Sequence, residues 1–193
     1  MASARVLIVY GSSYGQTERI SERLRTLLTA AGCDVVLFRG DAVPHWLWLG
    51  DFDGVVVGAS VIGGKYQRYI ERFARAHHEE LNRLPSAFFG VSGAAGSSEP
   101  AGREEAVRVM DRFLADVGWR PRLTASVAGA MAYSRYNPFL RFVMRRMARK
   151  NGERDTRYDR EYTDWTQVQE LARQLGTLLR PSVPTETGQL IEA

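Results

Sequence analysis

The chain has 193 residues, of which 45% are hydrophobic and 25% charged, and its formal net charge is +4 with a sequence pI near 9.5. These values predict one soluble globular domain with a sizeable core, and no apolar run approaches the roughly 18 residues that a membrane-spanning helix needs. The single cysteine, Cys33, excludes an intramolecular disulfide and indicates a reducing compartment, and the apolar run near the N-terminus is too short for a secretory signal.

Segments with strand character alternate along the chain with segments whose apolar residues recur at the helical period. In chain order, the sequence predicts a strand at Arg5–Tyr10, a helix at about 16–31, strands at Cys33–Arg39 and Gly54–Ser60, a helix at about 65–81, a strand at Ser86–Ser92, a helix at about 104–117, a strand at Leu123–Ala130 and a helix at about 164–179. This alternation predicts an α/β fold in which helices cover both faces of a parallel sheet.

Five such strands suit a flavodoxin-like doubly wound sheet with strand order 2-1-3-4-5. We expect a single domain over residues 4–180, a helical insertion after the fifth strand at about 131–163, and a disordered tail over 181–193. Ligands of such folds bind beyond the carboxyl ends of the strands, where the strand order reverses. The loops after strands one, three and four are therefore expected to hold the chemistry.

The loop after strand one, Gly11–Thr17, is rich in hydroxyl groups and leads directly into a helix. Ser12, Ser13 and Thr17 offer hydroxyl donors beside the free backbone N–H groups and the positive dipole of the helix start, a combination that suits a phosphate monoester. The loop lacks the Gly-Lys-Ser/Thr ending of a Walker loop and the three spaced glycines of a dinucleotide fingerprint. An ordinary capped helix start is the alternative interpretation.

The loops after strands three and four, Gly58–Tyr66 and Ser92–Glu99, consist largely of small residues that let backbone approach a flat ring. Beside a phosphate site, two such loops describe a flavin slot, although glycines also simply mark turns. The predicted cofactor-binding residues are Ser12, Ser13, Tyr14, Gly15, Gln16 and Thr17 in the first loop, Ala59, Ser60, Val61, Gly63 and Tyr66 in the second, and Ser92, Gly93, Ala94 and Ala95 in the third.

The sequence offers few candidates for catalysis by side chains alone. None of the three histidines, His45, His77 and His78, lies beside Cys33 or a serine in a nucleophile motif. No cluster has the spacing of metal ligands, so we expect no metal site. The chemistry is therefore expected to come from a cofactor, with the protein supplying position and electrostatics.

Short motifs spread over nearly the whole predicted domain carry a family resemblance. They are YGQT at Tyr14–Thr17, GAS and GKY at Gly58–Ser60 and Gly64–Tyr66, LPSAFF at Leu84–Phe89, WRP at Trp119–Pro121, AGA and YSRY at Ala128–Ala130 and Tyr133–Tyr136, and TDW at Thr163–Trp165. By these motifs the chain resembles the flavodoxin-like, quinone-dependent protoporphyrinogen IX dehydrogenases of bacterial haem biosynthesis. Tyr14 stands where the family motif has an acidic residue.

The resemblance implies an FMN-dependent enzyme that oxidises protoporphyrinogen IX to protoporphyrin IX, with menaquinone or another quinone as electron acceptor. It assigns no catalytic acid or base, and it places the protein in the cytoplasm or peripherally on the inner face of the cell membrane. The alternatives are a soluble flavodoxin-type electron carrier, another flavodoxin-domain quinone reductase, or a module that has lost the cofactor. Carriers of that kind tend to be acidic, so the pI near 9.5 counts against the first alternative.

The predicted insertion contains a basic amphipathic stretch, Asn137–Lys150. As a helix it would place apolar residues on one side and arginines on the other, and it is too short to span a bilayer. Three interpretations remain: contact with a membrane surface, contact with the substrate propionates, or an ordinary surface helix. No groove-reading motif indicates nucleic acid. The candidate substrate or membrane contacts are Arg135, Arg141, Arg145, Arg146 and Arg149.

Replacing the arginines of this stretch by glutamine tests the first two interpretations against the third. The variant Arg141→Gln, Arg145→Gln, Arg146→Gln and Arg149→Gln is expected to lose activity or liposome binding, because it removes positive charge, while FMN binding stays intact. Co-sedimentation with anionic liposomes and steady-state assays measure the two effects. Unchanged activity together with unchanged liposome binding would support the ordinary surface helix.

Overall fold

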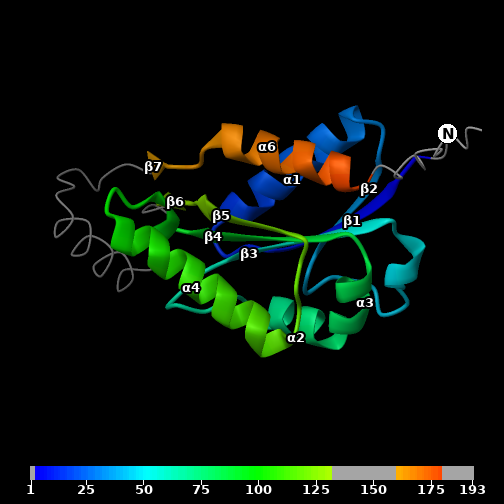
Figure 1. The fold of residues 1–193 in the computed structure, drawn as a ribbon, viewed down its shortest axis with the longest axis horizontal. Coiled ribbons are helices and arrows are strands. Elements are labelled where there is room, and N and C mark those ends of the chain that lie inside the picture. Colours follow the sequence, from blue (N-terminus) through cyan, green and yellow to red (C-terminus); the bar gives the residue numbers. More distant parts are fainter. Residues whose placement is uncertain (1–2, 132–159, 180–193) are drawn as a thin grey trace, which may run out of the picture.

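The computed structural model describes residues 3–131 and 160–179, and a five-stranded parallel sheet lies at its centre (Figure 1). The strands are β1 Arg5–Gly11, β2 Asp34–Arg39, β3 Gly54–Ser60, β4 Ser86–Ser92 and β5 Leu123–Ala128. Their order in the sheet is β2-β1-β3-β4-β5, and every neighbouring pair is parallel. The predicted doubly wound sheet and its strand order are therefore confirmed.

Helices cover both faces of this sheet (Figure 1). On one face lie α1 Gln16–Ala30 and α6 Trp165–Leu178. The other face carries α2 Arg68–Ala76, α3 His78–Arg83 and α4 Pro100–Val117. Short 3-10 turns occur at η1 Leu49–Asp51 and η2 Ala94–Gly96. A two-stranded antiparallel ribbon pairs β6 Ala130–Met131 with β7 Arg160–Glu161. Residues 132–159, which make up most of the insertion predicted at about 131–163, lie outside the described residues, as does the predicted tail.

The central strands are buried on both faces, which explains their continuous apolar character. In β1, Val6 and Ile8 pack with α1 and α6, whereas Leu7 and Val9 pack with α2 and α4. The alternation divides the apolar residues into two cores, one on each side of the sheet. The sheet and both helical layers are held together by this burial.

The predicted helix over 65–81 is two helices, α2 and α3, separated at His77. The side chain of His78 explains the break, because its Nδ1 donates to the carbonyl of Arg75 at 3.0 Å and satisfies a terminal acceptor of α2. Burial against α2, where the His77 ring lies 4.9 Å from the Phe73 ring, lowers the pKa of His77.

Leucines, and not tryptophans, cover the core in the segment before β3. The side chains of Trp46 and Trp48 are 73% and 64% exposed. By contrast, Leu49 is fully buried and Leu47 packs against the same core. Two turns, one closed by the Leu47 N–H on the Pro44 carbonyl and the other η1, shape this segment so that the leucines lie inward and the tryptophans outward.

Trp119 is the largest fully buried side chain, and its polar atom is satisfied. Its Nε1 donates to Ser86 Oγ at 3.1 Å, and Ser86 Oγ donates to the carbonyl of Leu81 at 2.7 Å. The ring also packs edge-on against Phe88, with centroids 5.7 Å apart. The WRP and LPSAFF motifs are therefore joined in the core, where they fix the start of β4 against α3 and α4.

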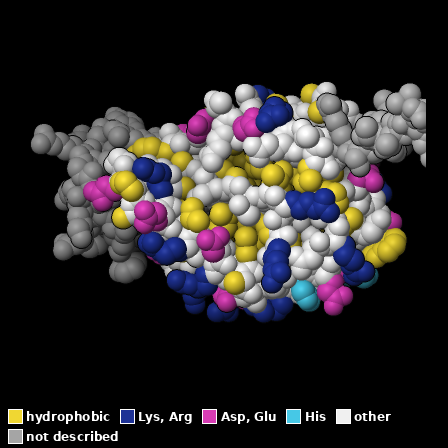
Figure 2. Space-filling model, viewed as in Figure 1, with side chains coloured by type: hydrophobic (Ala, Val, Ile, Leu, Met, Phe, Trp, Pro, Cys, Tyr) yellow, Lys and Arg dark blue, Asp and Glu magenta, His cyan; other side chains and the backbone are white. Residues whose placement is uncertain are grey.

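The surface over the β5 edge of the sheet is apolar in its middle. Figure 2 shows apolar side chains in a band across this face, between the charged side chains of the helical layers above and below. β5 is an edge strand, and Leu123 and Ala125 are only partly buried. Among the residues that the structure describes, no helix combines the length and the apolar character that crossing a bilayer requires.

A Gly→Ala substitution in β3, with a matched control in α6, tests how tightly the core is packed around the sheet. A Cβ on Gly58 would lie 2.0 Å from Cζ of Phe89, so Gly58→Ala is expected to lower the free energy of unfolding by about 1–3 kcal/mol. The matched control is Gly176→Ala in α6, where a Cβ meets nothing within 4 Å, and it is expected to raise stability by about 0.5–1 kcal/mol. Urea unfolding measures both, and equal effects would contradict this packing.

Candidate cofactor-binding site

Three loops meet at the carboxyl edge of the sheet. Gly11 at the end of β1 lies opposite Ala59 of β3, and Ser60 lies opposite Val91 of β4. The backbone N–H of Val61 donates to the carbonyl of Val91 at 2.9 Å, which continues the pairing past β3. The sheet therefore brings together the loops after β1, β3 and β4 that the sequence predicts to carry the chemistry, and we call them the first, second and third loop.

The first loop is a tight turn that needs glycine at one position. Gly15 has φ 93°, in the left-handed region, and its N–H donates to Ser12 Oγ at 2.9 Å. Its carbonyl accepts the first helical hydrogen bond of α1 from Arg19 at 3.1 Å. The turn aims the N–H groups of the first turn of α1, which have no partner within the helix, at the end of β1.

Thr17 carries the clearest sign that this loop receives a ligand. Its side chain is fully buried, yet Oγ1 has no hydrogen-bond partner within the described part of the chain. An unsatisfied buried hydroxyl costs about 1–3 kcal/mol. A phosphate oxygen at the start of α1 would accept from this hydroxyl and from the neighbouring N–H groups, so the donor set fits a phosphate monoester.

A hollow of about 300 Å³ opens beside the first loop, on the side of β2. Its lining residues are Tyr10, Ser12, Ser13, Tyr14, Gly15, Glu18 and Arg39. Tyr10 donates to Glu18 Oε1 at 2.9 Å, and burial followed by this hydrogen bond raises the pKa of Tyr10 to about 12. Arg39 pairs with Asp41 at 3.0 Å. Sequence reasoning missed Arg39, although its place at the end of the strand next to β1 is a usable signal.

Gln67 links the first and second loops, and sequence reasoning missed it as well. Its Nε2 donates to Ser13 Oγ at 3.0 Å and to Ser60 Oγ at 2.5 Å. The residue follows Tyr66 directly and precedes α2 as its N-cap. The two serines lie 54 and 7 residues away from Gln67 in sequence, so its contact with both of them forms only in the folded chain.

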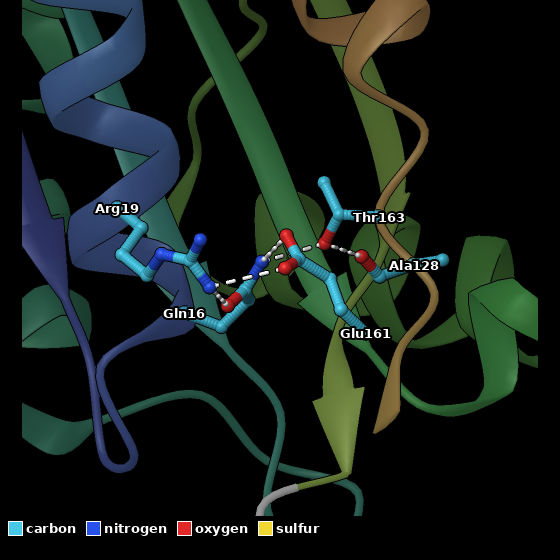
Figure 3. A network of polar contacts seen from close by, with 5 residues as sticks. All are labelled: Gln16, Arg19, Ala128, Glu161 and Thr163. Carbon is cyan, nitrogen blue, oxygen red and sulfur yellow. Dashed lines mark hydrogen bonds and ion pairs between the residues drawn. The ribbon is translucent and has the colours of Figure 1, made fainter. Parts of the chain in front are cut away.

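Gln16 points away from the loop and into a polar network with the segment around β7 (Figure 3). Its Nε2 donates to Glu161 Oε1 at 2.9 Å and to Thr163 Oγ1 at 2.8 Å, and Thr163 Oγ1 donates to the carbonyl of Ala128 at 2.8 Å. Arg19 closes the network with donations to Gln16 Oε1 at 3.3 Å and Glu161 Oε2 at 3.1 Å. The side chain of Gln16 thus holds α1 against β5 and β7, which leaves its backbone for a ligand.

Tyr66 supports the second loop from behind. It is 8% exposed, and its ring packs edge-on against Phe88 and Phe113 at centroid distances of 5.2 and 4.9 Å. Its hydroxyl occupies the space where a Cβ on Gly90 would lie, at 2.3 Å. The structure therefore places this ring in the core and not on the surface of the slot.

The rest of the second loop is a tight, exposed turn. Its central residues, Gly63 and Gly64, have φ 58° and 75°, and a bridge between Ile62 and Lys65 closes it. Ala59 is buried, whereas Ser60 and Val61 are partly exposed at the edge of the sheet. At the edge of the sheet this loop therefore presents backbone and the side chains of Ser60 and Val61, and farther along it the exposed side chain of Ile62.

The third loop repeats the turn of the first. Ser92 Oγ accepts from the N–H of Ala95 at 3.1 Å, as Ser12 Oγ accepts from Gly15. Gly93 is exposed and Ala94 is partly exposed, so backbone again forms the surface. The second and third loops thus provide two walls of small residues for a flat ring.

Arg135, Arg141, Arg145, Arg146 and Arg149, the candidate substrate or membrane contacts, lie outside the described residues. Over residues 3–131 and 160–179, no group of three or more His, Cys, Asp or Glu side chains is arranged to hold a metal ion.

Sequence comparison relates the chain to known proteins over most of its length. The flavodoxin domain family matches residues 7–159. The protoporphyrinogen IX dehydrogenase (quinone) of Escherichia coli strain K12 is 34% identical over 177 residues, which cover 90% of this chain and 96% of that protein. The protein of the same name from Leishmania major is 30% identical over 195 residues, which cover 98% of this chain and 82% of that protein.

Comparison with solved structures gives the same fold. The oxidised flavodoxin 1 of Bacillus cereus aligns with a TM-score of 0.53 at 15% identity, covering 91% of this chain and 97% of that chain. A flavodoxin of Streptococcus pneumoniae aligns with a TM-score of 0.51 at 17% identity, covering 91% and 97%. At these identities the likeness concerns the fold alone.

Removing the orphan hydroxyl should stabilise the protein in the absence of a ligand. Thr17→Val is expected to raise the free energy of unfolding of the flavin-free protein by about 1 kcal/mol, because it deletes an unsatisfied buried donor and keeps the side-chain shape. Thr26→Val is the matched control on α1, since Thr26 is exposed and donates to the Glu22 carbonyl at 3.0 Å. Urea unfolding measures both, and a loss of stability in Thr17→Val would show that its hydroxyl has a partner.

Proposed function

The chain belongs to the flavodoxin domain family, and we propose that it is an FMN-dependent dehydrogenase that oxidises protoporphyrinogen IX to protoporphyrin IX with a membrane quinone as electron acceptor. The observation that supports cofactor binding most directly is the buried hydroxyl of Thr17 at the start of α1, which has no hydrogen-bond partner among residues 3–131 and 160–179. The support for the substrate and the acceptor is the name of the relatives, which match nearly the whole chain.

The residues of the three loops fit an FMN molecule in one orientation. Thr17 Oγ1 and the N–H groups at the start of α1 would hold the phosphate. The backbone around Ser60–Val61 and Gly93–Ala95 would face the isoalloxazine ring, since no large side chain of these segments fills the space between them. Ser12 and Ser92 act on the loops themselves, because each hydroxyl accepts from its own turn.

The protein's part in the reaction is position and electrostatics. FMN supplies two-electron redox chemistry when bound, and full aromatisation of a porphyrinogen requires three such two-electron oxidations. The Tyr10 phenol, with a pKa raised to about 12, stays neutral and keeps its hydrogen bond to Glu18 at physiological pH. That bond engages the carboxylate of Glu18, which lies in the first turn of α1.

A quinone acceptor places the second half-reaction at a membrane surface. The proposal therefore puts the protein in the cytoplasm and peripherally at the inner face of the cell membrane, with menaquinone as the acceptor. The pI near 9.5 agrees with attraction to anionic lipid and argues against a carrier that docks basic partners.

Binding of FMN and riboflavin separates the phosphate site from the ring site. Wild-type protein is expected to bind FMN with loss of flavin fluorescence, and Thr17→Val is expected to weaken FMN by roughly 10- to 100-fold, the range for a hydrogen bond to a charged group. Riboflavin has no phosphate, so its affinity should be the same in both proteins. No flavin binding by the wild type would end the proposal.

Anaerobic turnover tests the reaction itself. The FMN-loaded protein is expected to convert protoporphyrinogen IX to fluorescent protoporphyrin IX in the presence of menaquinone, whereas omission of either the quinone or FMN should abolish turnover. An FMN-loaded protein without turnover would favour an electron carrier or another quinone reductase over this proposal.

A further inference from the structure

Gln67 occupies the gap that any ligand spanning the first and second loops has to cross. Ser13 follows β1 and Ser60 ends β3, and these two strands are neighbours in the sheet. The Gln67 amide bridges the two hydroxyls from the start of α2, on the far side of the gap from α1. The bridge therefore lies between the proposed phosphate site and the proposed ring site.

The amide also has an acceptor that nothing satisfies. Gln67 Oε1 is buried without a hydrogen-bond partner among the described residues. It fits there only because Gly11 has no side chain: a Cβ on Gly11 would lie 2.6 Å from Oε1. A buried acceptor without a donor costs about 1–3 kcal/mol, so a ligand hydroxyl that donates here would offset a cost already present in the free protein.

The chemistry of the gap matches one part of the proposed cofactor. FMN joins its ring to its phosphate through a chain that carries three hydroxyl groups, and each hydroxyl can donate and accept. With the phosphate at α1 and the ring between the second and third loops, this chain has to pass over the Ser13–Gln67–Ser60 bridge. A chain without hydroxyl groups would leave Oε1 unsatisfied.

We propose that Gln67 is a recognition residue for the hydroxylated chain of the flavin, an inference that rests on the proposed binding of FMN. Its Oε1 accepts a hydrogen bond from one ribityl hydroxyl. The terminal torsion of a glutamine is soft, so the amide turns toward the ligand at little cost. The turned amide oxygen has two lone pairs, so it can accept from one of the two serine hydroxyls and from the ligand, while the contact with the other serine is given up.

The competing role for Gln67 is a structural tie between two loops. Both roles predict weaker FMN binding when the amide is lost, so the ligand has to be varied together with the residue. The test uses Gln67→Met, which keeps the length of the side chain, and Gln67→Asn, which keeps the amide but withdraws it by one methylene. The ligands are FMN and its 2′-, 3′- and 4′-deoxy analogues, which all retain the phosphate and the ring.

If Gln67 recognises one ribityl hydroxyl, the effect of changing Gln67 depends on whether the ligand carries that hydroxyl. Both variants are expected to bind FMN about 2- to 10-fold more weakly than wild type, the range for a neutral hydrogen bond, by fluorescence titration. The deoxy analogue that lacks the recognised hydroxyl should bind wild type and variants equally, as in a double-mutant cycle. Gln67→Met removes the orphan acceptor together with the two hydrogen bonds to Ser13 and Ser60, so the thermal midpoint of the flavin-free variant is measured as the control for loss of the tie between the loops.

Three results would overturn the inference. Unchanged FMN affinity in Gln67→Met would show that the amide does not contact the cofactor. An equal loss for FMN and all three analogues would assign Gln67 to structure alone. Failure of the wild type to bind FMN would remove the proposed function and the inference together, whereas the first two results leave the proposed function standing.

Discussion

β1 pairs with β2 on one side and with β3 on the other, and the site depends on this position in the sheet. Because all strands are parallel, the chain leaves β1 toward one face through α1 and leaves β3 toward the other face through α2. The first and second loops therefore diverge above two neighbouring strands. Their divergence opens the gap in which backbone N–H groups, Thr17 and Gln67 can reach a ligand.

The hydrogen bonds of Gln16 fix the start of α1 relative to the sheet. Gln16 and Thr163 are both buried, and their hydrogen bonds connect the first turn of α1 to the end of β5. Adjacent residues of α1 thus have different roles: within the described part of the chain, Gln16 makes two side-chain donations, whereas Thr17 makes none. Loss of a fully satisfied buried network would leave several groups unpaired, so the start of α1 is held more rigidly than an ordinary helix end.

Hydrophobic patterning predicts the fold well because the strands of this sheet are buried on both faces, and short continuous apolar runs such as Val6–Val9 or Val55–Val57 are typical of such strands. It also locates the three loops, since their positions follow from the strand order. It cannot find Gln67, whose contacts join two loops across the sheet, and it indicates Arg39 only through its position at the end of β2. Nor does it show that Tyr66, with an apolar body beside a small-residue loop, is covered by Phe113 of α4.

Two buried polar atoms beside the loops have no hydrogen-bond partner among the described residues, which indicates that this part of the molecule is adapted to bind a ligand. Thr17 Oγ1 and Gln67 Oε1 are buried beside neighbouring strands, although natural proteins satisfy most buried polar groups. Thr17 could be replaced by an apolar residue of similar shape with a gain in stability, so the presence of its hydroxyl needs another reason. A ligand that carries an acceptor at one end and a donor one chain length away satisfies both atoms at once. A phosphate followed by a polyol has this order of groups, and the order of the loops along the sheet therefore sets the direction in which the cofactor lies.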